Sequence, residues 1–271
     1  MIKKTLTVAG VAAAFFAQAQ DVSTVRNAAD VYHGTVPGTS KYNAMAGAVG
    51  ALGSDVSAIH VNPAGVGVAI ASDFSGTLYI QNNQSNSSLF GTSTNYKVKT
   101  VGLGQVGGVA AFEIQKDSPW KFVNLGVNYS TKSIENYVET RANNQISFPV
   151  GDQTDVAFNR HAYDRIGDLS KLSIAVGGNY DNRFYIGAGI NLHGATIDQS
   201  DAAEMIYSDD ASSESFYKQY TPYSEAASGF SATLGVIGKI NNVVRLGASV
   251  ETPTWWKIDR AYNYYDKDDS N

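Results

Sequence analysis

The strongest constraint on this chain is a two-residue period in its hydrophobicity between Lys171 and Asp198. Large apolar side chains alternate with small or polar ones along two runs, and Asp181-Asn182 lies between the runs as a two-residue turn signal. Because successive side chains of a strand point to opposite faces, we predict a β-hairpin with one apolar face. That face comprises Leu172, Ile174, Val176, Phe184, Ile186, Ala188, Ile190 and Leu192; the opposite face comprises Ser173, Ala175, Gly177, Tyr185, Gly187, Gly189, Asn191 and His193.

Such a hairpin fits two environments. In a soluble sandwich the apolar face is core, whereas in an outer-membrane barrel it faces lipid and the polar face lines the lumen. Hydrophobic residues make up 43% of the chain, yet no run approaches the ~20 apolar residues of a membrane-spanning helix. A membrane location would therefore depend on strands. The 26 glycines and 16 tyrosines are typical of a glycine- and aromatic-rich barrel, and the net charge of −5 argues against a nucleic-acid partner.

The N-terminus has the three parts of a secretory signal peptide. Lys3-Lys4 is positively charged, residues 5–16 are mainly apolar, and Ala17-Gln18-Ala19 is a small-x-small cleavage site. We predict a signal peptide over residues 1–19, with a short buried helix as the alternative. The absence of cysteine excludes a disulfide scaffold and a lipoprotein. An exported β protein of this kind favours a transmembrane barrel in the outer membrane of a Gram-negative cell.

From Ser72 onwards we predict about seven antiparallel strands joined by alternating long and short connections. Outer-membrane barrels have this asymmetry, with short periplasmic turns and longer outer loops. Trp120 and Trp255-Trp256 fall near opposite ends of their strands, where aromatic girdles lie. The predicted strands are 72–81, 96–114 with a bulge near Gly107-Gly108, 121–132, the two strands of the hairpin, 224–240 and 243–258; the predicted long connections are 82–95, 133–170 and 199–222.

Residues 20–71 lack a strand pattern and are rich in glycine and alanine. Small residues let backbones pack closely, so this segment suits a plug inside a lumen; an ordinary loop and helix before a β domain is the alternative. Ser54 is a candidate N-cap for a short helix starting at Asp55. The sequence Asn62-Pro63-Ala64-Gly65 predicts a turn.

Three parts of the chain together resemble one family. Residues 42–65, which end in Asn62-Pro63-Ala64-Gly65, are similar to an N-terminal hatch with an Asn-Pro-Ala-Gly signature, and residues 172–195 and 229–254 are similar to hairpins of the same family. Together they resemble the FadL/TodX family of outer-membrane transporters for long-chain fatty acids and other hydrophobic compounds, in particular its Bacteroidetes branch.

The resemblance implies a monomeric barrel of about fourteen strands that is plugged by its own N-terminus. Residues 20–71 would then be the hatch and residues 72–271 the first part of the barrel. Single-chain bacterial barrels have an even number of strands, so we interpret the chain as the N-terminal part of a longer barrel protein. The implied function is passive transport of a long-chain fatty acid or other hydrophobic ligand. The alternatives are a non-transporting surface barrel used for adhesion or structure, and a soluble β-sandwich binder.

The candidate functional residues fall into two groups. The hatch group, which follows from the resemblance, is Asn62, Pro63, Ala64 and Gly65, with Asn43, Met45 and Gly47. The lumen-lining group, which follows from the strand pattern, is Asn191, His193, Arg245 and Glu251. Arg245 and Glu251 are candidates to pair with each other or to meet a substrate carboxylate, with a bracing network as the alternative.

Catalysis finds little support in the sequence. There is no Gly-x-Ser-x-Gly, no His-Glu-x-x-His and no phosphate-binding loop. Ser173 and His193 are predicted to face inward on adjacent strands, which is the arrangement a barrel lipase would need. The histidines show no metal-ligand spacing. We therefore expect neither an enzyme nor a metal or other cofactor.

Overall fold

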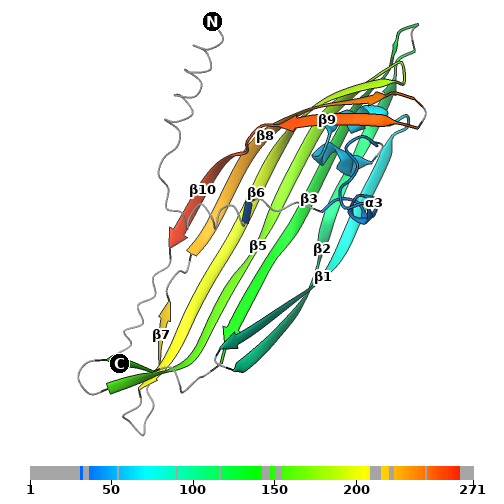
Figure 1. Cartoon of the computed structure of the whole chain (residues 1–271). Helices are drawn as coiled ribbons and strands as arrows, with labels where there is room; N and C mark the ends of the chain where they lie inside the picture. The colour runs from blue at the N-terminus through cyan, green and yellow to red at the C-terminus, as the bar shows by residue number, and fades with distance from the viewer. Residues whose placement is uncertain are drawn as a thin grey trace, which may run out of the picture. The chain divides into compact units, whose positions relative to one another are not determined.

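The structure is a computed structural model of the 271-residue chain (Figure 1). It describes residues 31–32, 37–53, 55–89, 91–115, 117–141, 147–150, 154–207, 215–219, 223–241 and 243–262. The chain divides into two compact units, Met1–Thr35 and Val36–Asn271. Of the first unit only residues 31 and 32 are described, both helical. The signal peptide predicted over residues 1–19 lies outside the described residues.

The described part of the second unit consists of short helices followed by antiparallel strands. Its helices are α3 (Ser40–Ala44) and the 3₁₀ helices η1 (Val56–His60) and η2 (Pro63–Val68). Its strands are β1 (Asp73–Leu89), β2 (Thr92–Glu113), β3 (Trp120–Thr140), β4 (Ser147–Val150), β5 (Thr154–Tyr180), β6 (Phe184–Tyr207), β7 (Ser215–Gln219), β8 (Tyr223–Lys239), β9 (Arg245–Glu251) and β10 (Trp255–Tyr262).

The sheet is an antiparallel meander in the order β1-β2-β3-β5-β6-β8-β10. The short strands β4 and β7 pair with β5 and β6, and β9 pairs with β8. Because β9 lies opposite Thr233–Lys239 and β10 opposite Tyr223–Phe230, these two strands share one position beside β8. The sheet therefore has seven strand positions and is curled (Figure 1). The predicted antiparallel all-β fold and its strand number are confirmed.

The predicted hairpin is present as β5 and β6, the most extensively paired strands of the sheet. Asp181 and Asn182 have φ values of 53° and 54°, and the Arg183 amide donates to the Tyr180 carbonyl at 3.1 Å. Positive φ at both central residues gives the turn a twist that matches the twist of the flanking strands. The loop has three residues, Asp181 to Arg183, instead of the predicted two, because Tyr180 lies opposite Phe184. An odd loop length is what places even-numbered residues of β5 opposite even-numbered residues of β6.

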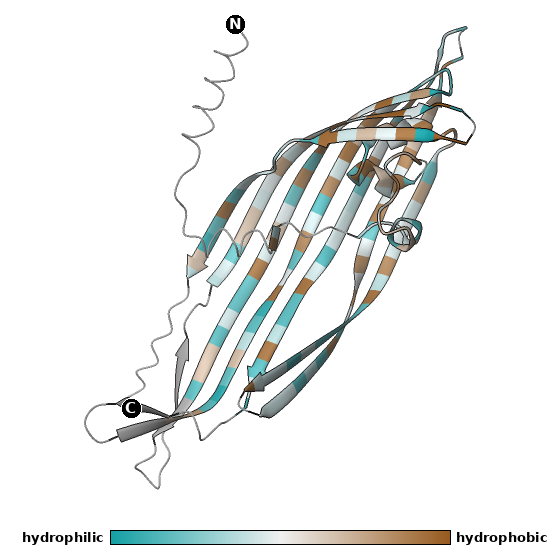
Figure 2. Ribbon diagram, viewed as in Figure 1, coloured by the Kyte–Doolittle hydropathy of each residue, from teal (hydrophilic) through white to brown (hydrophobic). Residues whose placement is uncertain are grey.

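The sheet exposes its apolar face and buries its polar face, which is the reverse of the arrangement in a soluble protein with a packed core. Ile186, Leu234 and Val236 on the outward face are 50%, 60% and 51% exposed, whereas Ser173 and Asn191 on the inner face are at most 1% exposed. Apolar and polar residues alternate along the strands in Figure 2. The helices η1 and η2 contact β3 and β5, and η2 also contacts β6 and β8. The short helices therefore lie against the polar face.

The predicted long connections are shorter than expected because the strands continue into them. Residues 82–95 were predicted as a loop, but β1 and β2 remain paired as far as Leu89 and Thr92. In the same way β5 begins at Thr154 and β6 ends at Tyr207. Pairing between strands uses backbone hydrogen bonds, so loss of the apolar alternation does not end a strand.

Two irregularities also differ from prediction. The register of β1 and β2 shifts between Thr77 and Leu78, which leaves Gly104 as the extra residue, not Gly107-Gly108. The strand predicted over residues 243–258 is interrupted at residues 252–254. Pro253 has no amide to donate there, and the Thr252 hydroxyl accepts from the Ala232 amide at 3.0 Å instead.

Candidate functional site

We call residues 37–53 and 55–71 the inner segment. Its first part is joined to η1 by hydrogen bonds of Thr39, the N-cap of α3. Thr39 Oγ1 donates to Asp55 Oδ2 at 2.8 Å, and the Thr39 amide donates to Ser57 Oγ at 2.7 Å. Asp55 is the N-cap of η1, in place of the predicted Ser54, which lies outside the described residues. These bonds hold α3 and η1 together as one compact piece.

Three predicted hatch residues shape the α3 turn. Asn43 Nδ2 donates to the Gly38 carbonyl at 3.0 Å, and the Gly38 amide donates back to Asn43 Oδ1 at 3.2 Å. Met45 is the C-cap of α3, and Gly47 has a φ of 79°, which favours glycine. The described side-chain hydrogen bonds of Asn43 are both with Gly38, within the inner segment. Its contribution here is to local structure.

The predicted Asn62-Pro63-Ala64-Gly65 turn is the start of η2. Asn62 is its N-cap, with Oδ1 accepting from the Ala64 amide at 3.0 Å, and Pro63 occupies the first helical turn, where its missing amide costs nothing. Asn62 Nδ2 donates to the Gly50 carbonyl at 2.8 Å, to the Val236 carbonyl at 3.1 Å and to a carbonyl of β9 at 3.4 Å. One buried amide therefore joins η2 to the rest of the inner segment and to the sheet.

The inner segment lies on a row of three glycines. Gly177 of β5, Gly187 of β6 and Gly235 of β8 are opposite one another in the strand register. A Cβ atom at any of them would overlap atoms of residues 62–67. The backbone of η2 reaches the sheet only because these positions carry no side chain.

Two hydrogen-bonding residues complete this row. Asn124 of β3 donates from Nδ2 to the carbonyls of Val66 at 2.8 Å and Ala69 at 2.7 Å. Ser249 of β9 donates from Oγ to the carbonyl of Val61 at 2.7 Å. Asn124 pairs with the glycine of β5 and Ser249 with that of β8. We call these two residues and the three glycines the docking row. Its two side chains, those of Asn124 and Ser249, donate hydrogen bonds to backbone carbonyls at the end of η1 and at the end of η2.

A second row of inward residues, four positions further along the strands, is polar. Asn128, Ser173, Asn191 and Ser231 are opposite one another on β3, β5, β6 and β8. Ser173 Oγ donates to Asn191 Oδ1 at 2.6 Å, Asn191 Nδ2 donates to Ser231 Oγ at 3.1 Å, and Ser231 Oγ donates to Glu251 Oε1 at 2.7 Å. This polar row is a continuous chain of hydrogen bonds from β5 to β9.

The structure brings three of the four predicted lumen-lining residues together at the end of the polar row. Glu251 Oε1 lies 3.1 Å from Asn191 Nδ2 and 3.5 Å from Lys171 Nζ, and His193 Nε2 lies 3.0 Å from Ser231 Oγ. The fourth, Arg245, is separate from them. Its Nη1 donates to the carbonyl of residue 52 at 3.3 Å, and it lies about 20 Å along β9 from Glu251. The predicted Arg245–Glu251 pair is therefore not formed.

His60 of η1 is a site residue that the sequence did not indicate. Its Nδ1 lies 3.1 Å from Ser173 Oγ, its Nε2 lies 3.0 Å from Ser130 Oγ, and Asn128 Nδ2 is 2.6 Å from the same Nε2. Burial, followed by the positive groups nearby, lowers the pKa of His60 from 6.5 to about 3. The imidazole is therefore neutral at the pH of most environments and binds the polar row as a neutral group.

The Ser173–His193 pair considered for catalysis is not formed. Ser173 binds His60 and His193 binds Ser231, and both hydroxyl-bearing residues are 0% exposed. Among the described residues there is no cluster of three or more side chains suited to hold a metal ion. In that same part of the chain, no helix has the length and hydrophobicity needed to cross a membrane.

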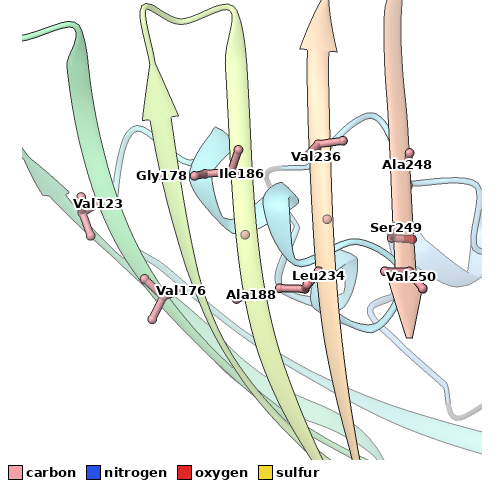
Figure 3. Close-up of a pocket in the computed structure, with 12 residues that line it drawn as sticks. Val123, Val176, Gly178, Ile186, Ala188, Leu234, Val236, Ala248, Ser249 and Val250 are labelled. Carbon is pink, nitrogen blue, oxygen red and sulfur yellow. The ribbon is translucent and has the colours of Figure 1, made fainter. Parts of the chain in front are cut away.

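The outward face carries an apolar hollow behind the docking row. Its volume is about 720 Å³, and its lining includes backbone atoms of Gly187 and Gly235. Figure 3 shows Ile186 and Leu234 on neighbouring strands, with the helices of the inner segment behind the sheet. At Gly187 and Gly235 the inner segment lies directly behind this wall, because a Cβ atom at either position would overlap atoms of Asn62, Pro63 or Ala64.

The docking row had a partial signal in the sequence. Gly177 and Gly187 both lie on the predicted polar face, and the three-residue loop Asp181–Arg183 of the structure places them opposite each other. Nothing in the sequence shows that η2 lies on them. Comparisons with protein-family models, with curated protein sequences and with solved protein structures found no match to this chain.

Proposed function

We propose that this chain forms part of an outer-membrane β-barrel that transports long-chain fatty acids or other hydrophobic molecules, with the inner segment as its hatch. The observation that carries the proposal is the polarity of the curled sheet, whose outward face is apolar and exposed while its inner face is polar and holds a docked segment. A soluble protein would bury its apolar face, whereas a membrane barrel presents it to lipid.

The outward apolar face has a defined limit. In one register row, the outward residues of five adjacent strands are Tyr129, Leu172, Leu192, Phe230 and Trp255. In the next outward row they are Thr131, Ser170, Gly194, Ser228 and Lys257. The change from apolar and aromatic to small and polar supports a boundary between lipid and headgroups, where aromatic side chains gather.

The height of the apolar face also suits a bilayer. On β6 the outward apolar residues run from Phe184 to Leu192, a stretch close to the ~9–11 residues with which a tilted strand crosses a membrane. The rest of β6 would then extend beyond the membrane on the long-loop side. A closed barrel also requires partners for the free edges of β1 and β10, since unpaired backbone groups cost several kcal/mol each in lipid.

The proposed mechanism is passive. Crossing the polar outer leaflet is unfavourable for a hydrophobic molecule. Binding in an apolar pocket stabilises such a molecule by ~0.8 kcal/mol for each methylene group removed from water. The inner segment would obstruct the lumen while it is docked, and its displacement would open a route past the docking row. We propose no catalytic step and no cofactor, and we propose a monomeric transporter for the full-length protein.

Uptake of a labelled fatty acid tests this function. Gram-negative cells without their own fatty acid transporter, expressing the full-length barrel protein that contains this chain, should accumulate radiolabelled oleate. Deletion of Asn62-Pro63 should abolish the uptake, while Ala188→Val, on the outward face, should retain it. Outer-membrane insertion without uptake would instead support a non-transporting surface barrel. Recovery in the soluble fraction would exclude both and favour a secreted β-sandwich.

A further inference from the structure

His60 connects the inner segment to the sheet through a titratable group. Its ring lies between β3 and β5, where Ser173, Ser130 and Asn128 contact its two nitrogens. The docking row, by contrast, uses amide, hydroxyl and carbonyl groups that do not titrate. Asp55 is also ionisable, but its described hydrogen bonds come from within the inner segment. A change of protonation can therefore act on the docking of this segment through His60.

The hydrogen bonds around His60 fit a neutral imidazole. The Asn128 amide donates to Nε2, which must then carry the lone pair. The ring proton is on Nδ1 and is donated to Ser173 Oγ, whose own hydroxyl donates to Asn191 Oδ1 at 2.6 Å. A second proton, on Nε2, would point at the Asn128 NH₂ group. Turning the Asn128 amide over would relieve this contact, because its oxygen has no hydrogen-bond partner, but the imidazolium charge would still be buried.

The charged groups nearest the ring oppose a second positive charge. Lys171 of β5 acts on His60 as a positive group, and His193 of β6 does so when its own imidazole is protonated. The acid in this region, Glu251 of β9, lies 3.5 Å from Lys171 Nζ and accepts hydrogen bonds from the polar row, so its charge is already engaged. Protonation of His60 in place would add a further positive charge to a region whose one carboxylate is already paired with Lys171.

The other elements that contact η1 do not change this balance. On β3, Lys132 follows Ser130 on the same face and is a further positive group. On β2, Glu113 is the last residue of the strand, far from the ring along the register. On β1, Asp73 is exposed and its carboxylate accepts from the Phe74 amide at 2.9 Å. The helix η2 (Pro63–Val68) has no titratable side chain.

We propose that His60 is an acid-sensitive docking contact, and that protonation of its imidazole releases the inner segment from the sheet. The inference concerns docking alone and does not depend on what, if anything, the barrel transports. The proton is the ligand that controls docking. The docked imidazole does not bind a second proton, whereas the imidazole of a released segment in water does.

The expected size of the effect follows from the two protonation equilibria. Burial, then Lys171 and His193, lower the pKa of docked His60 to about 3, whereas a released ring in water has the ordinary value of 6.5. Above pH 6.5 both forms are neutral and docking has its full strength. Below it the released form takes up a proton that the docked form does not, so the ratio of released to docked segment should rise about 30-fold at pH 5 and about 300-fold at pH 4.

A distance between the inner segment and the sheet tests this proposal directly. The chain contains no cysteine, so Lys41→Cys on α3 and Val243→Cys at a short turn can be labelled with nitroxides at neutral pH. Both side chains are exposed. Pulsed electron paramagnetic resonance on the protein in vesicles should give one distance at pH 7.5 and a growing second population between pH 6 and pH 4. A pair within the sheet, Asp198→Cys with Val243→Cys, should keep its distance.

Variants decide whether His60 is responsible. His60→Gln should dock at pH 7.5 and show no acid-induced population, whereas the matched control His161→Gln, on the far part of β5, should behave as the unmodified chain. If His60→Gln fails to dock at all, Lys171→Met replaces it as the test. Loss of that positive charge raises the pKa of docked His60, so release should require a lower pH. Release that persists in His60→Gln, or is absent from the unmodified chain down to pH 4, would overturn the proposal.

Discussion

The amide of Asn62 occupies the space that a Cβ atom on Gly235 would need. From this position it donates to the carbonyl of Val236, the residue next to Gly235 on β8, at 3.1 Å, and accepts from the Ala64 amide within its own helix at 3.0 Å. A side chain that caps a helix thus also fills the gap left by a glycine in the sheet. The docking of the inner segment therefore depends on both Asn62 and Gly235, and the two residues can be substituted separately.

Replacement of Gly235 by alanine should weaken docking by overlap with Asn62. Forcing a methyl group into a packed interface typically costs about 1–3 kcal/mol. We expect the urea concentration at the unfolding midpoint in lipid vesicles to fall accordingly. Gly238→Ala is the matched control on the same strand, because a Cβ there meets only the Phe184 ring, at 3.6 Å and beyond. Equal unfolding midpoints for the two variants would show that the close approach of Asn62 to Gly235 does not contribute to the free energy of unfolding.

Asn62→Ala should loosen η2 more than Asn43→Ala loosens α3. The Asn62 amide binds carbonyls of the inner segment and of the sheet, and leaving buried carbonyls without partners costs about 1–3 kcal/mol, whereas Asn43 bonds locally to Gly38 and is exposed. Amide hydrogen exchange is the measurement. We expect faster exchange over residues 58–69 in Asn62→Ala and no change there in Asn43→Ala. Similar exchange in both variants would contradict the assigned role of Asn62.

A lysine on the outward face distinguishes a lipid-facing from a water-facing sheet. Ile186 is 50% exposed, so Ile186→Lys should be nearly neutral in a soluble protein. In a barrel wall it should cost about 2–4 kcal/mol, since the ammonium would lie in hydrocarbon. The fraction of chain that inserts into vesicles after dilution from urea reports the difference. Ser228→Lys, beyond the apolar face, provides the control and should insert normally; if Ile186→Lys inserts equally well, the outward face does not meet lipid.

The adjacent tryptophans of β10 should respond differently to lipid. Trp255 points outward, is 59% exposed and stacks on Phe230 with ring centroids 6.1 Å apart, whereas Trp256 lies on the inner face with its ring centroid 5.5 Å from that of His193. In single-tryptophan proteins, brominated acyl chains should quench the fluorescence of Trp255 strongly and that of Trp256 weakly. Equal quenching would mean that lipid reaches both faces of β10.

The strand pattern predicts the polarity of nearly every wall position, because side-chain direction in a strand depends only on residue parity. That is why the two faces predicted for the hairpin are the two faces of β5 and β6. Strand ends are less predictable. The polar residues 82–89 remain in β1 because backbone pairing with β2 continues without apolar side chains.

The candidate site shows the same division. The sequence predicts a turn at Asn62-Pro63-Ala64-Gly65, whereas in the structure these residues begin the helix η2 with Asn62 as its N-cap. It does not indicate that Asn62 reaches Val236, 174 residues later, or that His60 reaches Ser173. Such contacts depend on where the inner segment crosses the sheet, which no local pattern encodes.

The amino-acid sequence by itself determined the strand alternation and the small side chains that allow close approach, because each follows from the geometry of a few neighbouring residues. The tertiary structure alone decided that η2 lies across Gly177, Gly187 and Gly235, that Lys171 rather than Arg245 pairs with Glu251, and that His60 is enclosed by the polar row. The physical reason is distance along the chain: these contacts join residues at least 68 positions apart, and only the folded sheet with the inner segment against it brings them within bonding range.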